Sequence, residues 1–125
     1  MNAALVFLGG GIGSLLRFGV YHAARLWLPP SFPFGTFAVN VLGGLAAGVV
    51  AGTMMQRSIG GSDPAYLFVM TGVLGGFTTF SAFSVDAVLL WQRGDQLAAT
   101  AYVAGSLLLA IVGVALGMAA VRALA

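Results

Sequence analysis

The chain has no cysteine, no lysine and no glutamate, and it has only one histidine. Without cysteine it can form no disulfide, no thiolate nucleophile and no sulfur ligand for a metal. No nucleophile and carboxylate cluster around the histidine in the sequence, so no catalytic constellation is indicated. A net charge of +2 is too small and too scattered for a nucleic-acid-binding surface. These absences argue against an enzyme and against a nucleic-acid-binding protein.

Charge of either sign is scarce and apolar residues dominate. Of the 125 residues, 60% are hydrophobic and 6% are charged, whereas soluble domains carry roughly 25% charged residues. Mean hydropathy is +1.04. This composition predicts an integral membrane protein. The N-terminal segment lacks the basic start of a cleaved signal peptide, so we expect it to be retained as the first span.

Four segments are long enough to cross a bilayer, which takes about 20 mostly apolar residues. They lie at about 3–28, 35–55, 65–91 and 97–122. Backbone polar groups can be satisfied in lipid only by helices or closed barrels, and the segments lack the strict alternation of barrel strands. We therefore predict one all-α domain of four transmembrane helices, residues 1–125, with both termini on one side of the membrane.

The arginines give no preferred orientation. Arg57 and Arg122 lie on the side of the termini, and Arg25 and Arg93 lie on the other side. Orientation normally follows an excess of Lys and Arg on one side. A tie predicts dual topology, with two copies inserted in opposite directions and paired as an antiparallel homodimer.

Glycine recurs at four-residue intervals along the segments. Examples are Gly9 and Gly13; Gly44, Gly48 and Gly52; and Gly113 and Gly117. Small residues at this spacing let helix backbones approach closely in membranes. We interpret these positions as packing seams rather than as ligand sites.

The stretch GGFTTFSAF, residues 75–83, lies in the middle of the third segment. Gly75-Gly76 followed by the β-branched Thr78-Thr79 is a poor helix and predicts a break at the centre of the span. Broken helices expose carbonyls that can coordinate a cation. Beyond the break, Phe80 and Phe83 share a helical face, and the positive edges of their rings can face a small anion.

Five further polar residues lie in or near the spans, and each allows a structural and a functional interpretation. Arg17 either snorkels to a headgroup or faces water or a partner. Asn40 either joins helices or binds a permeant ion or water, and Asp86 is either a surface acid or part of a pore mouth. Tyr102 and Ser106 lie on one helical face, as a hydrogen-bonding track or as packing residues.

Three stretches together resemble the Fluc/CrcB family of fluoride channels. They are GGGIGSLLRF at 9–18, GTFAVNVLGG at 35–44 and GVLGGFTTFSAFS at 72–84. The resemblance covers all four spans in order and includes the family's most specific motif. It implies an antiparallel homodimer with two fluoride pathways, in the inner (plasma) membrane, that exports fluoride that entered as HF and was trapped as the ion.

The resemblance also implies roles for particular residues. Backbone carbonyls of Gly75 and Thr78 would hold a structural Na⁺, and Arg17 and Asp86 are vestibule candidates. The expected fluoride pathway comprises Asn40, Thr79, Phe80, Ser81, Phe83, Ser84, Tyr102 and Ser106. Two departures stand out. Ala110 occupies a position where the family's polar track usually carries another serine, and Asp86 stands where glutamate is frequent.

Two other functions fit parts of the sequence. A proton-coupled multidrug exporter can also have four helices and dual topology, but it needs an acidic residue deep in a span. The three acids here, Asp63, Asp86 and Asp95, all lie away from span centres. A non-conducting packing subunit would explain the glycines but not a polar stripe beside a broken helix.

Overall fold

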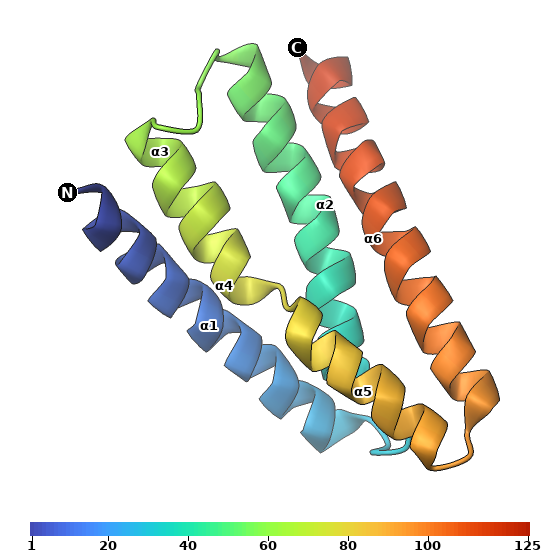
Figure 1. Ribbon diagram of the computed structural model, residues 1–125. Helices are drawn as coiled ribbons and strands as arrows, with labels where there is room; N and C mark the ends of the chain where they lie inside the picture. Colours follow the sequence, from blue (N-terminus) through green and yellow to red (C-terminus); the bar gives the residue numbers. More distant parts are fainter.

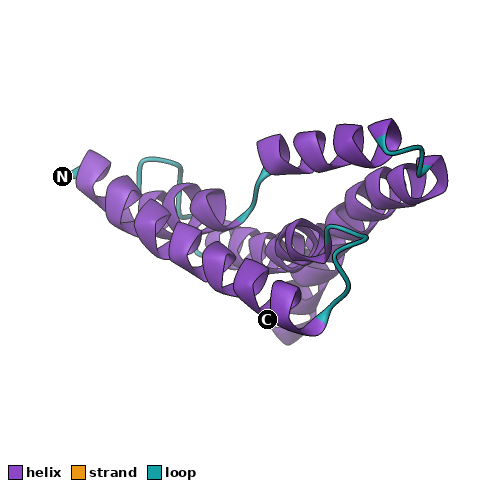
Figure 2. Cartoon of the chain, turned by 90° about the horizontal axis from the view of Figure 1, so that it is seen from below, coloured by secondary structure: helices purple, strands orange, loops and turns teal.

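The computed structural model describes residues 1–125, and its helices are joined by short loops with no strand (Figure 2). Three of the four spans are single helices, and the third is made of consecutive shorter elements. The elements are α1 (Asn2–Trp27), α2 (Phe34–Gln56), α3 (Pro64–Tyr66), η1 (Leu67–Leu74), α4 (Gly75–Phe77), α5 (Phe80–Gln92) and α6 (Gln96–Leu124).

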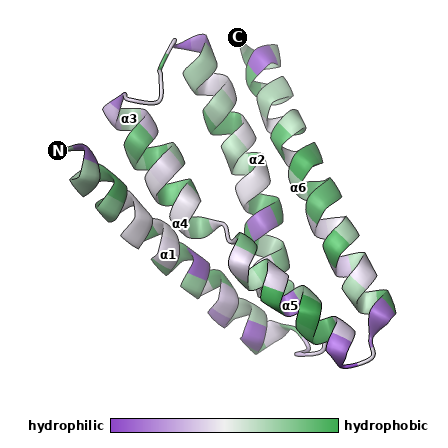
Figure 3. Cartoon of the chain, in the orientation of Figure 1, coloured by the Kyte–Doolittle hydropathy of each residue, from purple (hydrophilic) through white to green (hydrophobic).

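Four helical segments are long and apolar enough to cross a membrane: 2–27, 34–56, 64–92 and 96–124. The termini and the α2–α3 loop lie at one end of the molecule, and the other two loops lie at the opposite end (Figure 1). Hydrophobic residues, coloured green, occur along all four spans (Figure 3). Only 19 of the 125 residues are buried, so most apolar side chains face outward, where lipid or another subunit can cover them.

Local sequence sets where the helices of the second half begin. Asp63 caps the third span, since its side chain accepts a hydrogen bond from the N–H of Ala65, and Pro64 occupies the first helical position. The side chain of Asp95 caps α6 in the same manner. Between α5 and α6, Gly94 has a φ of 82°, a left-handed conformation that glycine adopts without strain.

The interruption in the third span lies at the threonines and not at the glycines. The break predicted over Gly75-Gly76 and Thr78-Thr79 is narrower than expected, because Gly75 and Gly76 belong to helix α4. The extended residues are Thr78, with ψ 161°, and Thr79, with φ −152° and ψ 124°. Gly76 instead provides contact space, because a Cβ there would lie against the backbone of Gly10 in α1.

The glycine repeats lie in two packing seams, as predicted. In the first seam, Gly9 and Gly13 of α1 lie directly against the backbone of η1 and α4. In the second, between α2 and α6, a Cβ on Gly44 would fall 2.6 Å from the carbonyl oxygen of Ala110, and one on Gly117 would fall 2.6 Å from that of Leu45. The small residues therefore set the helix separation, as expected for close-packed membrane helices.

We expect Gly48→Ala to destabilise the protein, because the added methyl group would meet the carbonyl oxygen of Val114 and push α2 away from α6. Overpacking of this kind typically costs about 1–3 kcal/mol. Gly19→Ala is the matched control, since nothing lies within 4 Å of a Cβ at that position. The measurement is the thermal unfolding midpoint in detergent, and equal midpoints for the two variants would contradict this account.

Candidate functional site

Asn40 provides the hydrogen-bond partners for the interrupted backbone of the third span. Its amide nitrogen donates to the carbonyl of Thr79, and its amide oxygen accepts from the N–H of Thr79, both at 2.9 Å. The side chain thus pairs with Thr79 as a neighbouring strand would. An unpaired buried peptide group costs free energy, so the hydrogen bonds of Asn40 stabilise extended backbone at this position.

The carbonyls of Gly75 and Thr78 are among those at the interruption that lose the donors a continuous helix would supply. The N–H of Thr79 would bond to the Gly75 carbonyl but donates to Asn40. The N–H of Ala82 would bond to the Thr78 carbonyl but donates to the side chain of Thr79. Arg17 donates from Nη1 to the Thr78 carbonyl at 3.2 Å, so its charge is directed to the interruption from the middle of α1.

A groove of about 290 Å³ runs between α2, the interruption and α6. It collects polar and aromatic residues that are distant in sequence. Its lining residues are Asn40, Gly43, Gly44, Ala47, Thr78, Thr79, Phe80, Phe83, Ser106, Leu107, Ala110 and Ile111. Five predicted pathway residues therefore line one groove, and Ala110 lines the same groove without offering a donor.

Hydrogen-bond donors in this region differ in whether the chain already uses them. The hydroxyl of Ser106 is buried and has no partner. The hydroxyl oxygen of Thr79 accepts from Ala82, which leaves its own hydrogen available. By contrast, Ser84 donates to the carbonyl of Phe80 at 2.9 Å, and Ser81 is exposed on the outer surface of α5. Neither Ser81 nor Ser84 lines the groove.

The two phenylalanines have different surroundings, although both line the groove. Phe80 is 75% exposed and Phe83 is 8% exposed. Their ring centroids are 5.6 Å apart, and the Phe83 ring lies 5.2 Å from that of Tyr102. Phe83 therefore also serves as a packing residue, whereas Phe80 has little packing role within one chain.

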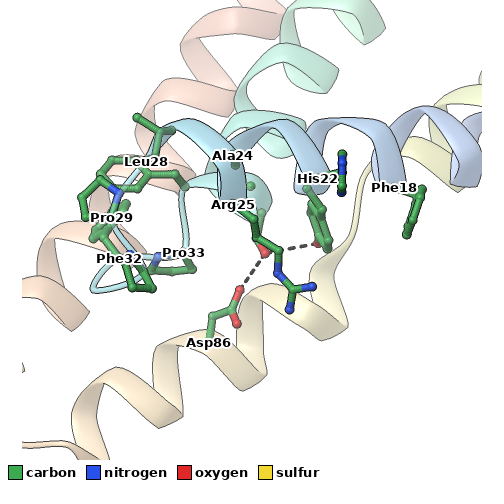
Figure 4. A pocket seen from close by; sticks show the side chains of 14 residues that line it. Phe18, His22, Ala24, Arg25, Leu28, Pro29, Phe32, Pro33 and Asp86 are labelled. Atoms are coloured by element: carbon green, nitrogen blue, oxygen red, sulfur yellow. Dashed lines mark hydrogen bonds between the residues drawn. The ribbon is translucent and has the colours of Figure 1, made fainter.

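Asp86 is neither a free surface acid nor paired with arginine, because two hydroxyl groups donate to its carboxylate. Thr36 donates to Oδ2 at 2.7 Å, and Tyr102 donates to the same oxygen at 3.2 Å. The Tyr21 hydroxyl lies 3.2 Å from that of Thr36. Figure 4 shows Asp86 directed from α5 into a pocket of about 590 Å³ near the α1–α2 loop.

Thr36 and Tyr21 were not among the residues expected from the sequence. A signal for Thr36 was present, because it precedes Asn40 by one turn and so shares its helical face. Tyr21 follows Arg17 by one turn of the first helix, but the sequence does not show which other helices pack against that turn. His22 is exposed, and its ring stacks on that of Phe18 with centroids 6.4 Å apart.

Comparisons with known proteins agree on one family. The family model described as CrcB-like protein, Camphor Resistance (CrcB), matches residues 4–118. A protein of Nitrobacter hamburgensis named fluoride-specific ion channel FluC 2 is 48% identical over 122 residues, covering 98% of each chain. A FluC protein of Rhodopseudomonas palustris is 47% identical over 124 residues, covering 99% of each. One of Rhizobium etli is 47% identical over 125 residues, covering 100% of this chain and 99% of the relative.

The matches extend over almost the whole chain, including all four spans and both sides of the groove. The relatives carry the names of ion channels and not of enzymes, which agrees with the missing catalytic constellation. Four apolar helices of membrane-spanning length fit a multi-pass membrane protein. The chain belongs to the CrcB family of membrane proteins, whose named relatives are fluoride-specific ion channels.

Proposed function

We propose that this protein is a fluoride-selective channel that lets fluoride leave the cell passively and so confers fluoride resistance. The groove between α2, α5 and α6 carries this proposal, because Asn40, Thr79, Phe80, Phe83 and Ser106 all line it. The names of the relatives support fluoride as the ion. Fluoride that enters as HF loses its proton in a more alkaline cytoplasm, and a channel then returns the ion to the outside.

Weak donors of the groove replace the water of the ion in this mechanism. Asn40 has two amide hydrogens, and only one of them bonds to Thr79. The hydroxyl hydrogens of Thr79 and Ser106 have no acceptor within the chain. Conduction requires sites that attract an ion without trapping it, and neutral donors in series meet this requirement better than a buried cation would.

The rings of Phe80 and Phe83 supply the remaining contacts in this proposal. The edge of an aromatic ring carries partial positive charge, so an anion can lie in the ring plane beside C–H groups. Phe83 is held by the Tyr102 ring. Phe80 is mostly exposed in one chain, so its ring is free to face an ion or a second subunit.

The functional unit in this proposal is an antiparallel homodimer in the inner membrane, with one groove per subunit and two pathways. Three observations support it. The arginine count favours neither orientation, Phe80 is largely exposed, and Gly75 and Ser81 are exposed close to the interruption. A polar and aromatic surface at this depth is poorly suited to lipid, and a second copy would cover it.

A structural Na⁺ at the two-fold axis fits the residues present. The carbonyls of Gly75 and Thr78 lack their helical donors, and neutral carbonyl oxygens suit hard cations. When bound, Na⁺ would supply positive charge that compensates these oxygens in both subunits. Arg17 already directs its guanidinium to the Thr78 carbonyl, which leaves the second lone pair of that oxygen for the cation.

Fluoride efflux from liposomes tests the proposed function directly. We expect the purified protein, reconstituted alone, to release trapped fluoride rapidly and to leave trapped chloride inside. A fluoride electrode and a chloride electrode record both ions from matched vesicles. Protein-free vesicles are the control, and efflux no faster than from these vesicles would contradict a channel function.

Phe80→Leu separates ring-edge contact from packing. Because Phe80 is 75% exposed, the change should alter stability by less than about 1.5 kcal/mol. Loss of the ring edge should still lower fluoride flux by orders of magnitude, since each 1.4 kcal/mol or so at the barrier is tenfold in rate. Phe83→Leu should also lower flux, with an added loss of stability through its contact with Tyr102. Near-normal flux through folded dimers of both variants would assign the rings to packing alone.

Dual topology predicts that C-terminal reporters active only inside or only outside the cytoplasm both give signal in one population. Changing Arg25→Ala with Arg93→Gln should favour one orientation, because both arginines lie on the same side. Activity should then fall and should return when an oppositely biased copy is co-expressed. Signal from one reporter alone in the unmodified protein would rule out the antiparallel dimer.

Removal of Na⁺ should lower the thermal unfolding midpoint of the purified dimer. A ligand that binds only the folded state stabilises it by mass action, so the midpoint should rise with Na⁺ concentration at constant ionic strength. N-methylglucamine is the control cation, because it is too large for a site made of carbonyls. Equal midpoints in the two cations would argue against the Na⁺ site, whatever the fluoride flux.

A further inference from the structure

Four helices contribute one residue each to a continuous hydrogen-bonded chain beside the groove. Tyr21 of α1 is followed by Thr36 of α2, Asp86 of α5 and Tyr102 of α6. Thr36 is 5% exposed and Tyr102 is fully buried. Tyr102 also contacts Phe83 of the groove, so the chain connects the groove to the larger pocket that Figure 4 shows.

Counting hydrogens fixes the direction of this chain. The Thr36 hydroxyl has one hydrogen, and its 2.7 Å contact with Asp86 is the shorter, charge-assisted bond. The hydroxyl of Tyr21 therefore donates to the oxygen of Thr36, at 3.2 Å. Tyr102 donates to Asp86 from the other side. All three hydroxyl hydrogens are directed along the chain toward one carboxylate.

The position of the Tyr21 ring is set by Gly35. A Cβ on Gly35 would lie 2.9 Å from Cδ1 and 3.3 Å from Cα of Tyr21, so the ring lies directly on this glycine. This contact brings the hydroxyl to the neighbouring Thr36. Arg25 and His22 line the same pocket, yet the partners of the Asp86 carboxylate are hydroxyls.

We propose that Tyr21 is a positioning residue for conduction that acts through Thr36 on Asp86 and Tyr102. The inference rests on the proposed function, because it concerns the barrier that fluoride meets beside the groove. A carboxylate near an anion path repels the ion unless hydrogen-bond donors stabilise the negative charge of the carboxylate. A hydroxyl that accepts a hydrogen bond becomes a stronger donor, so Tyr21 strengthens the hydrogen bond from Thr36 to Asp86. Without the Tyr21 hydroxyl, the Asp86 carboxylate and the Tyr102 hydroxyl are positioned less firmly. The barrier to fluoride conduction then rises.

Fluoride current through single channels in planar bilayers is the measurement. Tyr21→Phe should lower it roughly threefold to tenfold, as expected for loss of one hydrogen bond at a barrier. Gly35→Ala keeps the hydroxyl but displaces the ring, and it should lower the current similarly. Tyr66→Phe is the matched control and should leave the current unchanged, since Tyr66 lies at the start of the third span and its hydroxyl makes no hydrogen bond.

Double variants separate positioning from packing. If Tyr21 acts through Thr36, then Tyr21→Phe should have no further effect once Thr36→Val has removed the intervening hydroxyl. Thr36→Ser keeps that hydroxyl and should keep the dependence on Tyr21. Independent losses that multiply in the Tyr21→Phe, Thr36→Val protein would overturn the inference and assign Tyr21 to packing.

The remaining outcomes distinguish this inference from the proposed function. If the unmodified protein conducts fluoride and Tyr21→Phe conducts equally well, the positioning role of Tyr21 is wrong and the channel function stands. If the unmodified protein carries no fluoride current, the proposed function fails and the inference falls with it.

Discussion

The structure depends above all on one side chain, Asn40, which pairs with the backbone of Thr79. Inside a bilayer no water is available to an open peptide group, so extended backbone survives only where protein supplies its partners. Asn40 supplies both a donor and an acceptor, each at 2.9 Å. A hydrophobic residue there would leave two peptide groups unsatisfied, and a continuous helix would then be the better alternative. The interruption is thus a property of two spans together.

Close helix packing is what lets Asn40 reach this position. Gly43, one turn after Asn40, lies against the methyl group of Thr78, and Gly44 and Gly48 place α2 against α6. Removing side chains from these seams gives up contact area but brings backbones together, which suits membrane helices. The result is an interruption with polar partners on one flank and a groove on the other. Glycine therefore acts on the site indirectly, by setting the distance between the packed helices.

Hydropathy and glycine spacing were sufficient to predict the spans and the seams, because both depend on local composition. The position of the interruption was not predictable in the same way. Gly75-Gly76 has weak helix propensity, yet both glycines stay helical, and the missing Cβ of Gly76 allows close tertiary contact with the backbone of Gly10. Partners such as Thr36 and Asp86, separated by 50 positions, follow from how helices pack, and no periodicity within one helix encodes this.

The hydrogen-bond donors of the chain fall into two classes, those whose hydrogen has an acceptor within the chain and those whose hydrogen has none. Thr36 and Tyr102 direct their hydrogens to Asp86, and Ser84 directs its hydrogen to its own helix. Ser106, Thr79 and the second amide hydrogen of Asn40 remain without acceptors beside the groove. A buried donor without an acceptor costs stability, so the partnerless hydroxyl of the buried Ser106 makes the fold less stable than it could be. In the proposed channel, an anion passing along the groove would supply the acceptor that these donors lack, and the unsatisfied donors would themselves be the basis of permeation.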